Sequence, residues 1–71
     1  MELLIGEIAQ RIRTLRDICE LSVEDMAEYI GCSVTDYELA ETGKTDFSFT
    51  FIYKCAEKFG VDMVELLTGD N

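Results

Sequence analysis

The stretch LSVEDMAEYIGCSVTDYELAETGK, residues 21–44, carries the signals that decide the fold. Ser22 precedes a run with helical apolar spacing, and Asp25 follows it three residues later, which is a variant of the capping box that starts a helix. Gly31 is a stop signal for that helix, and Ser33 repeats the start signal almost at once. The sequence therefore predicts two short helices so closely joined that they must cross steeply instead of lying antiparallel.

The second of these helices is expected over residues 34–42, with Gly43 as its stop. Asp36 lies in its first turn, where a carboxylate favours the positive end of a helix. Tyr37 is expected to turn inward as a core ring with its hydroxyl at the edge. The two helices and their short connection form a helix-turn-helix with its core at about residues 22–43.

Three further helices are predicted from apolar residues at three-and-four spacing, over about residues 5–20, 49–59 and 62–67. Asp46 or Ser48 is expected to cap the second of them. No stretch favours a strand over a helix, so we expect an all-α fold, a compact five-helix domain that spans residues 1–71 as a single unit. The residues expected to be buried on these three helices are Ile5, Ile8, Ala9, Ile12, Leu15, Ile18, Cys19, Phe51, Ile52, Cys55, Ala56, Phe59, Val64, Leu66 and Leu67.

The charge balance argues against a nucleic-acid partner. With 15 acidic and 6 basic residues the chain has a net charge of −9, which repels phosphate at long range. Three of the basic residues, Arg11, Arg13 and Arg16, lie close together in the sequence, so a local positive patch remains open.

Nothing in the sequence predicts catalysis, a cofactor or a metal site. The chain has no His, and its three cysteines are odd in number and widely spaced, which fits neither a disulfide framework nor a zinc site. We interpret Cys19, Cys32 and Cys55 as small buried hydrophobic residues of a cytoplasmic protein. The amino-terminal residues lack the basic region and long apolar run of a signal peptide or membrane span.

Aromatic side chains occupy alternate positions at Phe47, Phe49, Phe51 and Tyr53. A helix cannot bury all four on one face, because alternate positions point in nearly opposite directions. One or two of these rings are therefore expected to be exposed. They would form a docking surface for a second copy or for another domain, unless loop packing covers them.

The motifs RIRTLR, LSVEDMAEYIGCS, YELAETGK and AEKFGVDMVELL together resemble the Cro/C1-type, or Xre-type, helix-turn-helix domains of phage and bacterial repressors. The resemblance runs from about Ile8 to Leu67. It implies a lambda-repressor-like fold, binding to operator DNA in the cytoplasm and a homodimer. The stretch DFSFTFIYKCAEKFGVDMVELLTG also resembles regulators in which such a domain precedes a cupin-type small-molecule sensor, which implies a carboxyl-terminal sensor domain that is missing from these 71 residues.

The same resemblance implies which residues contact DNA, because in this family the second helix of the motif enters the major groove. It also implies an ion pair between Arg16 and Glu41 that ties the first helix to the third, a structural role and not a DNA contact. The implied DNA contacts are Val34, Thr35, Glu38 and Leu39 near base edges, and Val23, Lys44 and Thr45 near phosphates.

The sequence departs from the family where contact with DNA is expected. Val23 stands where the family usually has Gln, and Val34 and Leu39 offer only apolar contact, such as with a thymine methyl group. Glu38 can accept a hydrogen bond from cytosine N4 but also adds repulsion, and a solvated surface role is the plainer interpretation. Two functions therefore stay open: a DNA-binding regulator domain, which the resemblance favours, and a protein–protein interaction module with weak or lost DNA binding, which the charge favours.

Overall fold

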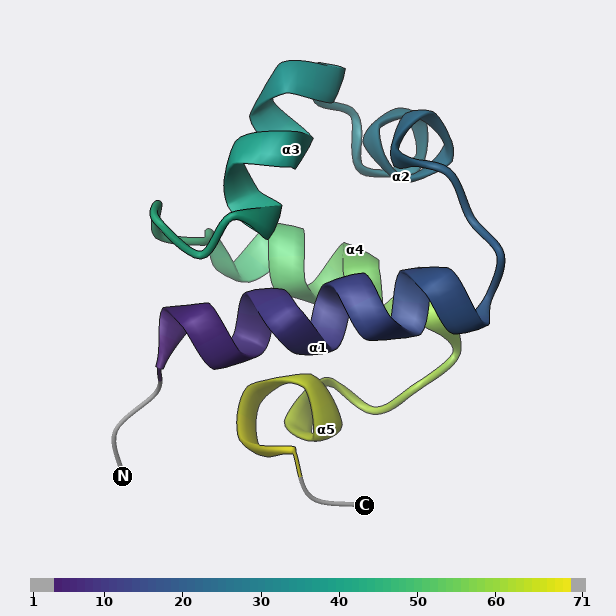
Figure 1. The fold of residues 1–71 in the computed structure, drawn as a ribbon. Coiled ribbons are helices and arrows are strands. Elements are labelled where there is room, and N and C mark those ends of the chain that lie inside the picture. Colours follow the sequence, from purple (N-terminus) through teal and green to yellow (C-terminus); the bar gives the residue numbers. More distant parts are fainter. Residues whose placement is uncertain (1–3, 70–71) are drawn as a thin grey trace.

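Residues 4–69 are described by the computed structural model, and within them the chain forms helices and no strand (Figure 1). The all-α prediction and the predicted order of helices are confirmed. The helices are α1 (Ile5–Ile18), α2 (Val23–Ile30), α3 (Val34–Glu41), α4 (Phe49–Phe59) and α5 (Met63–Thr68).

Local signals set the helix starts as predicted. The Ser22 hydroxyl accepts from the Asp25 amide at 3.0 Å, and the Asp25 carboxylate accepts from the Ser22 amide at 3.1 Å, so both halves of the capping box are present. Ser33 and Ser48 cap α3 and α4 in the same way, each accepting from the amide three residues later. Gly31 ends α2 in the left-handed conformation, with φ of 90°.

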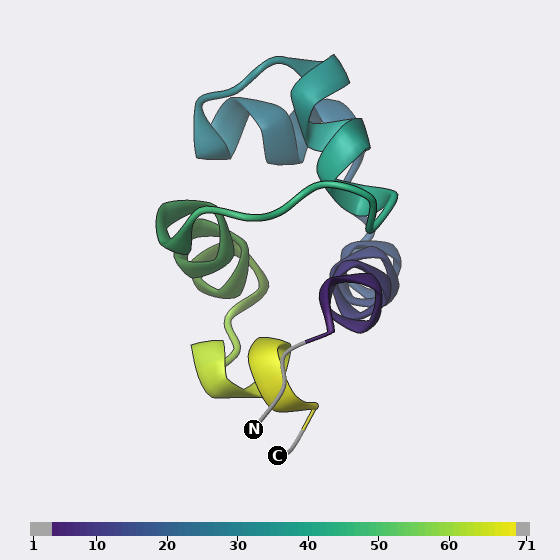
Figure 2. The same ribbon diagram turned by 90° about the vertical axis from the view of Figure 1, so that its left-hand side faces the viewer.

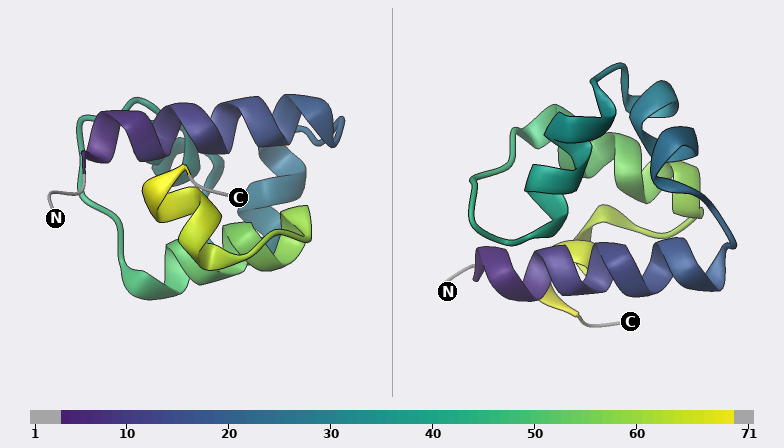
Figure 3. Two further views of the ribbon diagram at one scale, coloured as in Figure 1. Left: turned by 90° about the horizontal axis from the view of Figure 1, so that it is seen from below. Right: turned by 45° about the horizontal axis from the view of Figure 1, so that its top comes forward.

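The helices are arranged around α1, which crosses the molecule between α3 on one side and α5 on the other (Figure 1). α4 lies across from α1, as the view along both helices shows (Figure 2). α2 packs on α3 and α4, and α5 closes the far side by crossing beneath α1 and α4 (Figure 3). The domain measures 31 × 23 × 19 Å.

One hydrophobic core joins all the helices. Its largest fully buried side chains come from different helices, so no helix can be removed without opening the core. They are Ile12 from α1, Met26 from α2, Tyr37 from α3, Cys55 from α4 and Leu66 from α5.

The end of α1 corrects two of the burial predictions. Ile18 is 70% exposed and Cys19 is exposed, although both were expected in the core. Ile18 lies well outside the face of α1 that Ile8, Ala9 and Ile12 bury. The helix ends at Ile18, not at Glu20, because Glu20 takes a left-handed φ of 56° and the Leu21 amide donates back to the Arg16 carbonyl. Cys19 is the C-cap residue and is exposed at this end of the helix.

A third burial prediction fails on α5. Val64 is 56% exposed, whereas Leu66 is buried and Met63 and Leu67 are half-buried. Residues 63, 66 and 67 share one face of a helix, and residue 64 falls outside it. Val64 therefore does not help to close the core.

The other two cysteines behave as small apolar residues. Cys55 is fully buried and Cys32 is half-buried. Burial raises the pKa of the Cys32 thiol, and it raises the pKa of Cys55 to about 12. Both thiols therefore stay protonated near neutral pH.

Candidate nucleic-acid interface

The outward face of α3 carries Thr35, Glu38, Leu39 and Thr42, all of which are exposed. These positions follow the three-and-four spacing that places side chains on one face of a helix. The opposite face is buried and includes Tyr37. The structure thus brings three of the predicted base-contacting residues together on one surface.

Val34, the fourth predicted base-contacting residue, lies differently. It is half-buried and packs against the hydrophobic core. Only part of its side chain is available at the surface of the first turn of α3.

An ion pair fixes the orientation of α3 against α1. Arg16 Nε donates to Glu41 Oε2 at 2.7 Å, and Arg16 Nη2 donates to Glu41 Oε1 at 3.2 Å, which is a two-pronged contact. The side chains are only 17% and 9% exposed, and the hydrogen bond to Glu41 raises the pKa of Arg16. Arg16 Nη1 also donates to the Leu21 carbonyl at 3.1 Å. The expected pair is present, and it joins α1, the start of α2 and α3.

Arg13 adds a second contact between α1 and α3 that the sequence reasoning missed. Its guanidinium donates to the backbone carbonyl of Glu41, at the end of α3 where carbonyls lack partners within the helix. Arg13 and Arg16 are three residues apart on one face of α1, and this spacing was the available signal. Arg13 is half-buried, so part of its charge remains at the surface.

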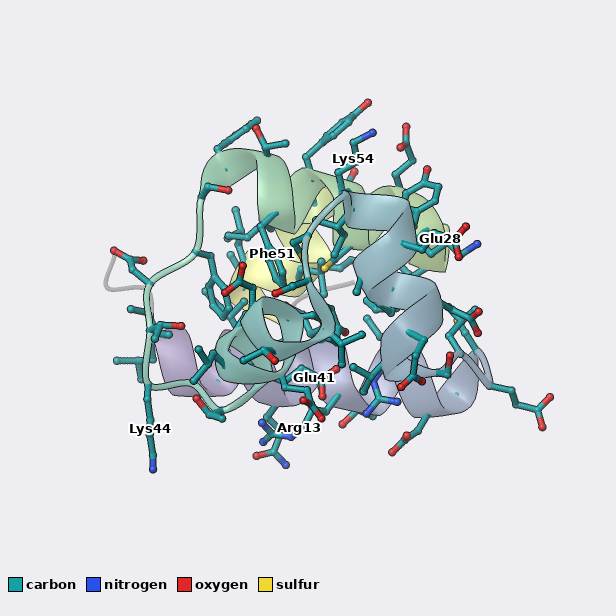
Figure 4. The ribbon with its side chains drawn as sticks, turned by 90° about the horizontal axis from the view of Figure 1, so that it is seen from above. Arg13, Glu28, Glu41, Lys44, Phe51 and Lys54 are labelled. Atoms are coloured by element: carbon teal, nitrogen blue, oxygen red, sulfur yellow. The ribbon has the colours of Figure 1, made fainter. Side chains whose placement is uncertain are left out.

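A surface hollow of about 370 Å³ lies between α1, the start of α2 and α3. It joins two predicted DNA-contacting residues, Val23 and Glu38, to Arg13 and Arg16 of α1. Figure 4 shows Glu41 beside Arg13, which lies at the edge of the molecule. The lining residues are Arg13, Arg16, Val23, Glu38, Glu41 and Thr42.

In the loop after α3, the Lys44 side chain faces solvent, whereas the Thr45 hydroxyl turns towards α3. Lys44 is exposed and projects from the same edge of the molecule as Arg13 (Figure 4). Its amide donates to the Thr42 hydroxyl at 3.2 Å. The Thr45 hydroxyl is directed at the Leu39 carbonyl, 3.4 Å away, and so is turned towards α3.

The remaining positive charges lie elsewhere. Arg11 donates to the carbonyls of Leu66 and Leu67 at 2.9 and 3.2 Å and so caps the end of α5. Lys54 and Lys58 lie over the ring of Tyr29, 5.5 and 5.0 Å from its centre. Lys54 is at the edge of the molecule opposite Lys44 and Arg13 (Figure 4). Little positive charge therefore remains beside α3.

The Tyr37 hydroxyl is fully buried and has no hydrogen-bond partner at normal distance among the described residues. Burial, and then the nearby Glu41 carboxylate, raise the pKa of Tyr37. The ring belongs to the core and takes no part in the exposed face of α3.

The aromatic positions divide as expected. Phe49 is 73% exposed and Tyr53 is 48% exposed, which confirms that one or two rings face solvent. Phe47 stacks on Phe51 at 5.4 Å between ring centres, and Phe51 is 5.8 Å from Tyr37. Beside Phe49 lies a mainly apolar groove of about 410 Å³, lined by Ile5, Ile8, Asp46, Phe47, Phe49, Ile52, Met63 and Leu67.

Two other kinds of site were sought. Within residues 4–69 no group of three or more His, Cys, Asp or Glu side chains is placed to hold a metal ion. Across the same residues none of the helices has the length and apolar character needed to cross a bilayer.

A family model described as a helix-turn-helix domain matches residues 7–68. Among solved structures, the restriction-modification controller protein C.AhdI from Aeromonas hydrophila is similar, with a TM-score of 0.80, 29% identity, and coverage of 87% of this chain and 94% of that one. The hypothetical transcription factor NHTF from Neisseria is similar with a TM-score of 0.82 and 27% identity, over 93% of this chain and 80% of that one.

The clp gene regulator ClgR from Corynebacterium glutamicum shares the fold, with a TM-score of 0.85 over 93% of this chain and 70% of that one, at 18% identity. Comparison with curated proteins gave no match. Together the family match and the two structures above 25% identity support a DNA-binding regulatory domain.

Proposed function

Because the chain belongs to the helix-turn-helix domain family, we propose that it is the sequence-specific DNA-binding domain of a prokaryotic transcription regulator. In this proposal residues 1–71 act as one domain, without a catalytic role, in the cytoplasm where the operator lies. The observation that carries the proposal is the outward face of α3, where Thr35, Glu38 and Leu39 project together from a helix anchored by the Arg16–Glu41 pair.

The proposed contacts follow from this geometry. α3 enters the major groove, so its outward face meets base edges and the exposed part of Val34 lies at the rim. Val23, at the first position of α2, and the loop after α3 lie on either side and meet phosphates. Arg13 joins them, because its half-exposed guanidinium lines the same hollow as Val23. Thr45 contacts DNA through its backbone, since its hydroxyl faces the Leu39 carbonyl.

Few cations lie beside α3, so we expect DNA binding with a shallow dependence on salt. Affinity for duplex DNA falls with salt in proportion to the number of phosphates that cations neutralise. Lys44→Gln is expected to reduce the slope of log affinity against log salt concentration by about 1 for each bound copy of the chain. It should weaken binding to a similar extent on every DNA sequence. Binding is measured by fluorescence anisotropy over a salt series, on duplexes selected from a random pool.

Lys54→Gln is the matched control, because it removes the same charge from the edge of the molecule opposite Lys44. It should leave the slope unchanged. The proposal of direct DNA binding is overturned if the random pool shows no enrichment at low salt. Equal slopes for the wild type and Lys44→Gln would remove Lys44 from the interface.

One observation favours a second candidate function. Glu38 places a carboxylate on the outward face of α3, Asp36 adds a second exposed carboxylate in the first turn, and the net charge is −9. A basic protein partner fits such a face better than phosphate does. Failure of the enrichment experiment, together with a folded domain, is the outcome that selects this alternative.

We further propose a homodimer, because two half-sites give specificity that one helix seldom provides. The groove beside Phe49 suits a two-fold contact, in which the same surface of both copies must be self-complementary. Phe49 protrudes at the rim of a groove that it lines, so each copy can insert its ring into the groove of the other. Asp46 is the one charged residue in the lining, and its carboxylate accepts from the Phe47 amide at 2.8 Å, so the rest of the groove is free for apolar contact.

Phe49→Ser is expected to weaken dimerisation by about tenfold or more, because an aromatic anchor in a pocket dominates such interfaces. Sedimentation equilibrium measures the change. Ile18→Ser is the control, since Ile18 is 70% exposed and lies at the opposite end of α1 from the groove residues Ile5 and Ile8. Equal dimerisation constants for the two variants would place the dimer interface elsewhere.

A further inference from the structure

Leu39 is the large hydrophobic residue that α3 exposes, with a relative exposure of 48%. On the outward face of α3, Thr35 lies one turn before Leu39, and Glu38 lies beside it. Leu39 does not contribute to the hydrophobic core, because Tyr37 and Ala40 form the buried face of α3. When this face meets DNA, as proposed, an apolar group of a base would remove the exposed part of Leu39 from water.

The polar residues of α3 cannot supply the usual recognition of purines. The helix, VTDYELAE, contains no Arg, Lys, Asn or Gln, which are the side chains that bond to guanine or adenine by two hydrogen bonds. Thr42 is also committed, because its hydroxyl donates to the Leu39 carbonyl at 2.6 Å and accepts from the Lys44 amide. Thr35 keeps a short hydroxyl without a side-chain partner among the described residues.

Leu39 is held in place by its surroundings. Its carbonyl accepts from the hydroxyls of Thr42 and Thr45, which lock the exit of the helix. The end of the same helix is tied to α1 through Glu41. Because α3 is held rigidly, the Leu39 side chain keeps a fixed position. An apolar contact made from that position can discriminate between bases.

We propose that Leu39 recognises the C5-methyl group of a pyrimidine in the major groove, and that this contact is the main base discrimination by α3. The inference rests on the proposed DNA-binding function. Thymine presents such a methyl group in the major groove, and 5-methylcytosine presents the same group. Glu38 acts beside it by repelling the acceptor atoms of guanine and accepting from the N4 amine of cytosine.

The test removes the methyl group from the DNA and its partner from the protein. Duplexes are first selected from a random pool with the wild-type chain. Each thymine of the selected half-site is then replaced singly by uracil, which lacks only the C5-methyl group, and each cytosine by 5-methylcytosine. Burial of one methyl-sized group corresponds to about a fourfold change in affinity for each half-site.

The expected result is one position at which uracil weakens binding about fourfold, or at which 5-methylcytosine strengthens it about fourfold. The first identifies thymine as the source of the methyl group and the second identifies 5-methylcytosine. The effect should vanish in Leu39→Ala and persist in Ile18→Ala, which removes an even more exposed aliphatic side chain from the end of another helix, α1.

Two outcomes overturn the inference while DNA binding stands: no position responds to the methyl group, or Leu39→Ala responds as the wild type does. A pool without enrichment is a different result, because it removes the DNA-binding function itself. Circular dichroism checks that Leu39→Ala is folded, as expected for a half-exposed site.

Discussion

Replacing Glu41 with alanine is expected to lower the free energy of unfolding by about 3–5 kcal/mol, the cost of leaving one charge of a buried pair without its partner. Arg16 is only 17% exposed and would keep its charge, because its guanidinium stays protonated at any pH at which the domain folds. Among residues 4–69 its guanidinium would then keep only the hydrogen bond to the Leu21 carbonyl and a 4.0 Å approach to Asp17. Urea unfolding followed by circular dichroism measures the loss.

Two further variants distinguish the loss of the pair from the loss of a side chain. Glu38→Ala removes an exposed carboxylate from the same helix and should change stability by no more than about 0.5 kcal/mol. The double variant Arg16→Met with Glu41→Met replaces the pair by apolar volume and should recover most of the stability, because a buried pair itself contributes little net free energy. If Glu41→Ala unfolds at the same urea concentration as Glu38→Ala, the pair does not hold α3 in place.

The parts of the fold that the sequence predicts well are those that local chemistry decides. Ser22, Ser33 and Ser48 start their helices because each hydroxyl meets an amide three residues away, and no distant residue is needed. The expected end of α1 at about Glu20 failed for a related reason. The left-handed turn at Glu20 ends α1 early. The sequence does not predict this turn, because the residue there is Glu and not Gly, the usual residue at a left-handed helix end.

The candidate site, in contrast, depends on contacts that local chemistry does not decide. The contact of Arg13 with the end of α3 joins segments 28 residues apart, and the Thr45 hydroxyl reaches the Leu39 carbonyl only because the loop folds back on α3. The resemblance placed the right helix at the surface, and the structure then separated Leu39, which is exposed, from Val34, which packs on the core. The contacts of these residues with DNA remain a prediction.

The second large effect is expected at Gly43, where the loop after α3 passes over the first turn of α1. Gly43 has φ of 75°, and a Cβ atom there would lie 2.9 Å from the Cα of Gly6, which is backbone and cannot swing aside. Gly43→Ala therefore meets two costs. The left-handed conformation costs a residue with a Cβ about 1–2 kcal/mol, and crowding in a packed region typically costs about 1–3 kcal/mol more.

Gly31→Ala separates these two costs. Gly31 has φ of 90°, but a Cβ there meets nothing within 4 Å, so this variant should show the conformational cost alone, about 1–2 kcal/mol. The difference between the two alanine variants in urea unfolding then measures the crowding against Gly6. Equal losses would mean that α1 and the loop can separate without cost. A larger loss at Gly43 would mean that the approach of the loop to α1 is a fixed part of the fold, and that the position of Lys44, the next residue, depends on it.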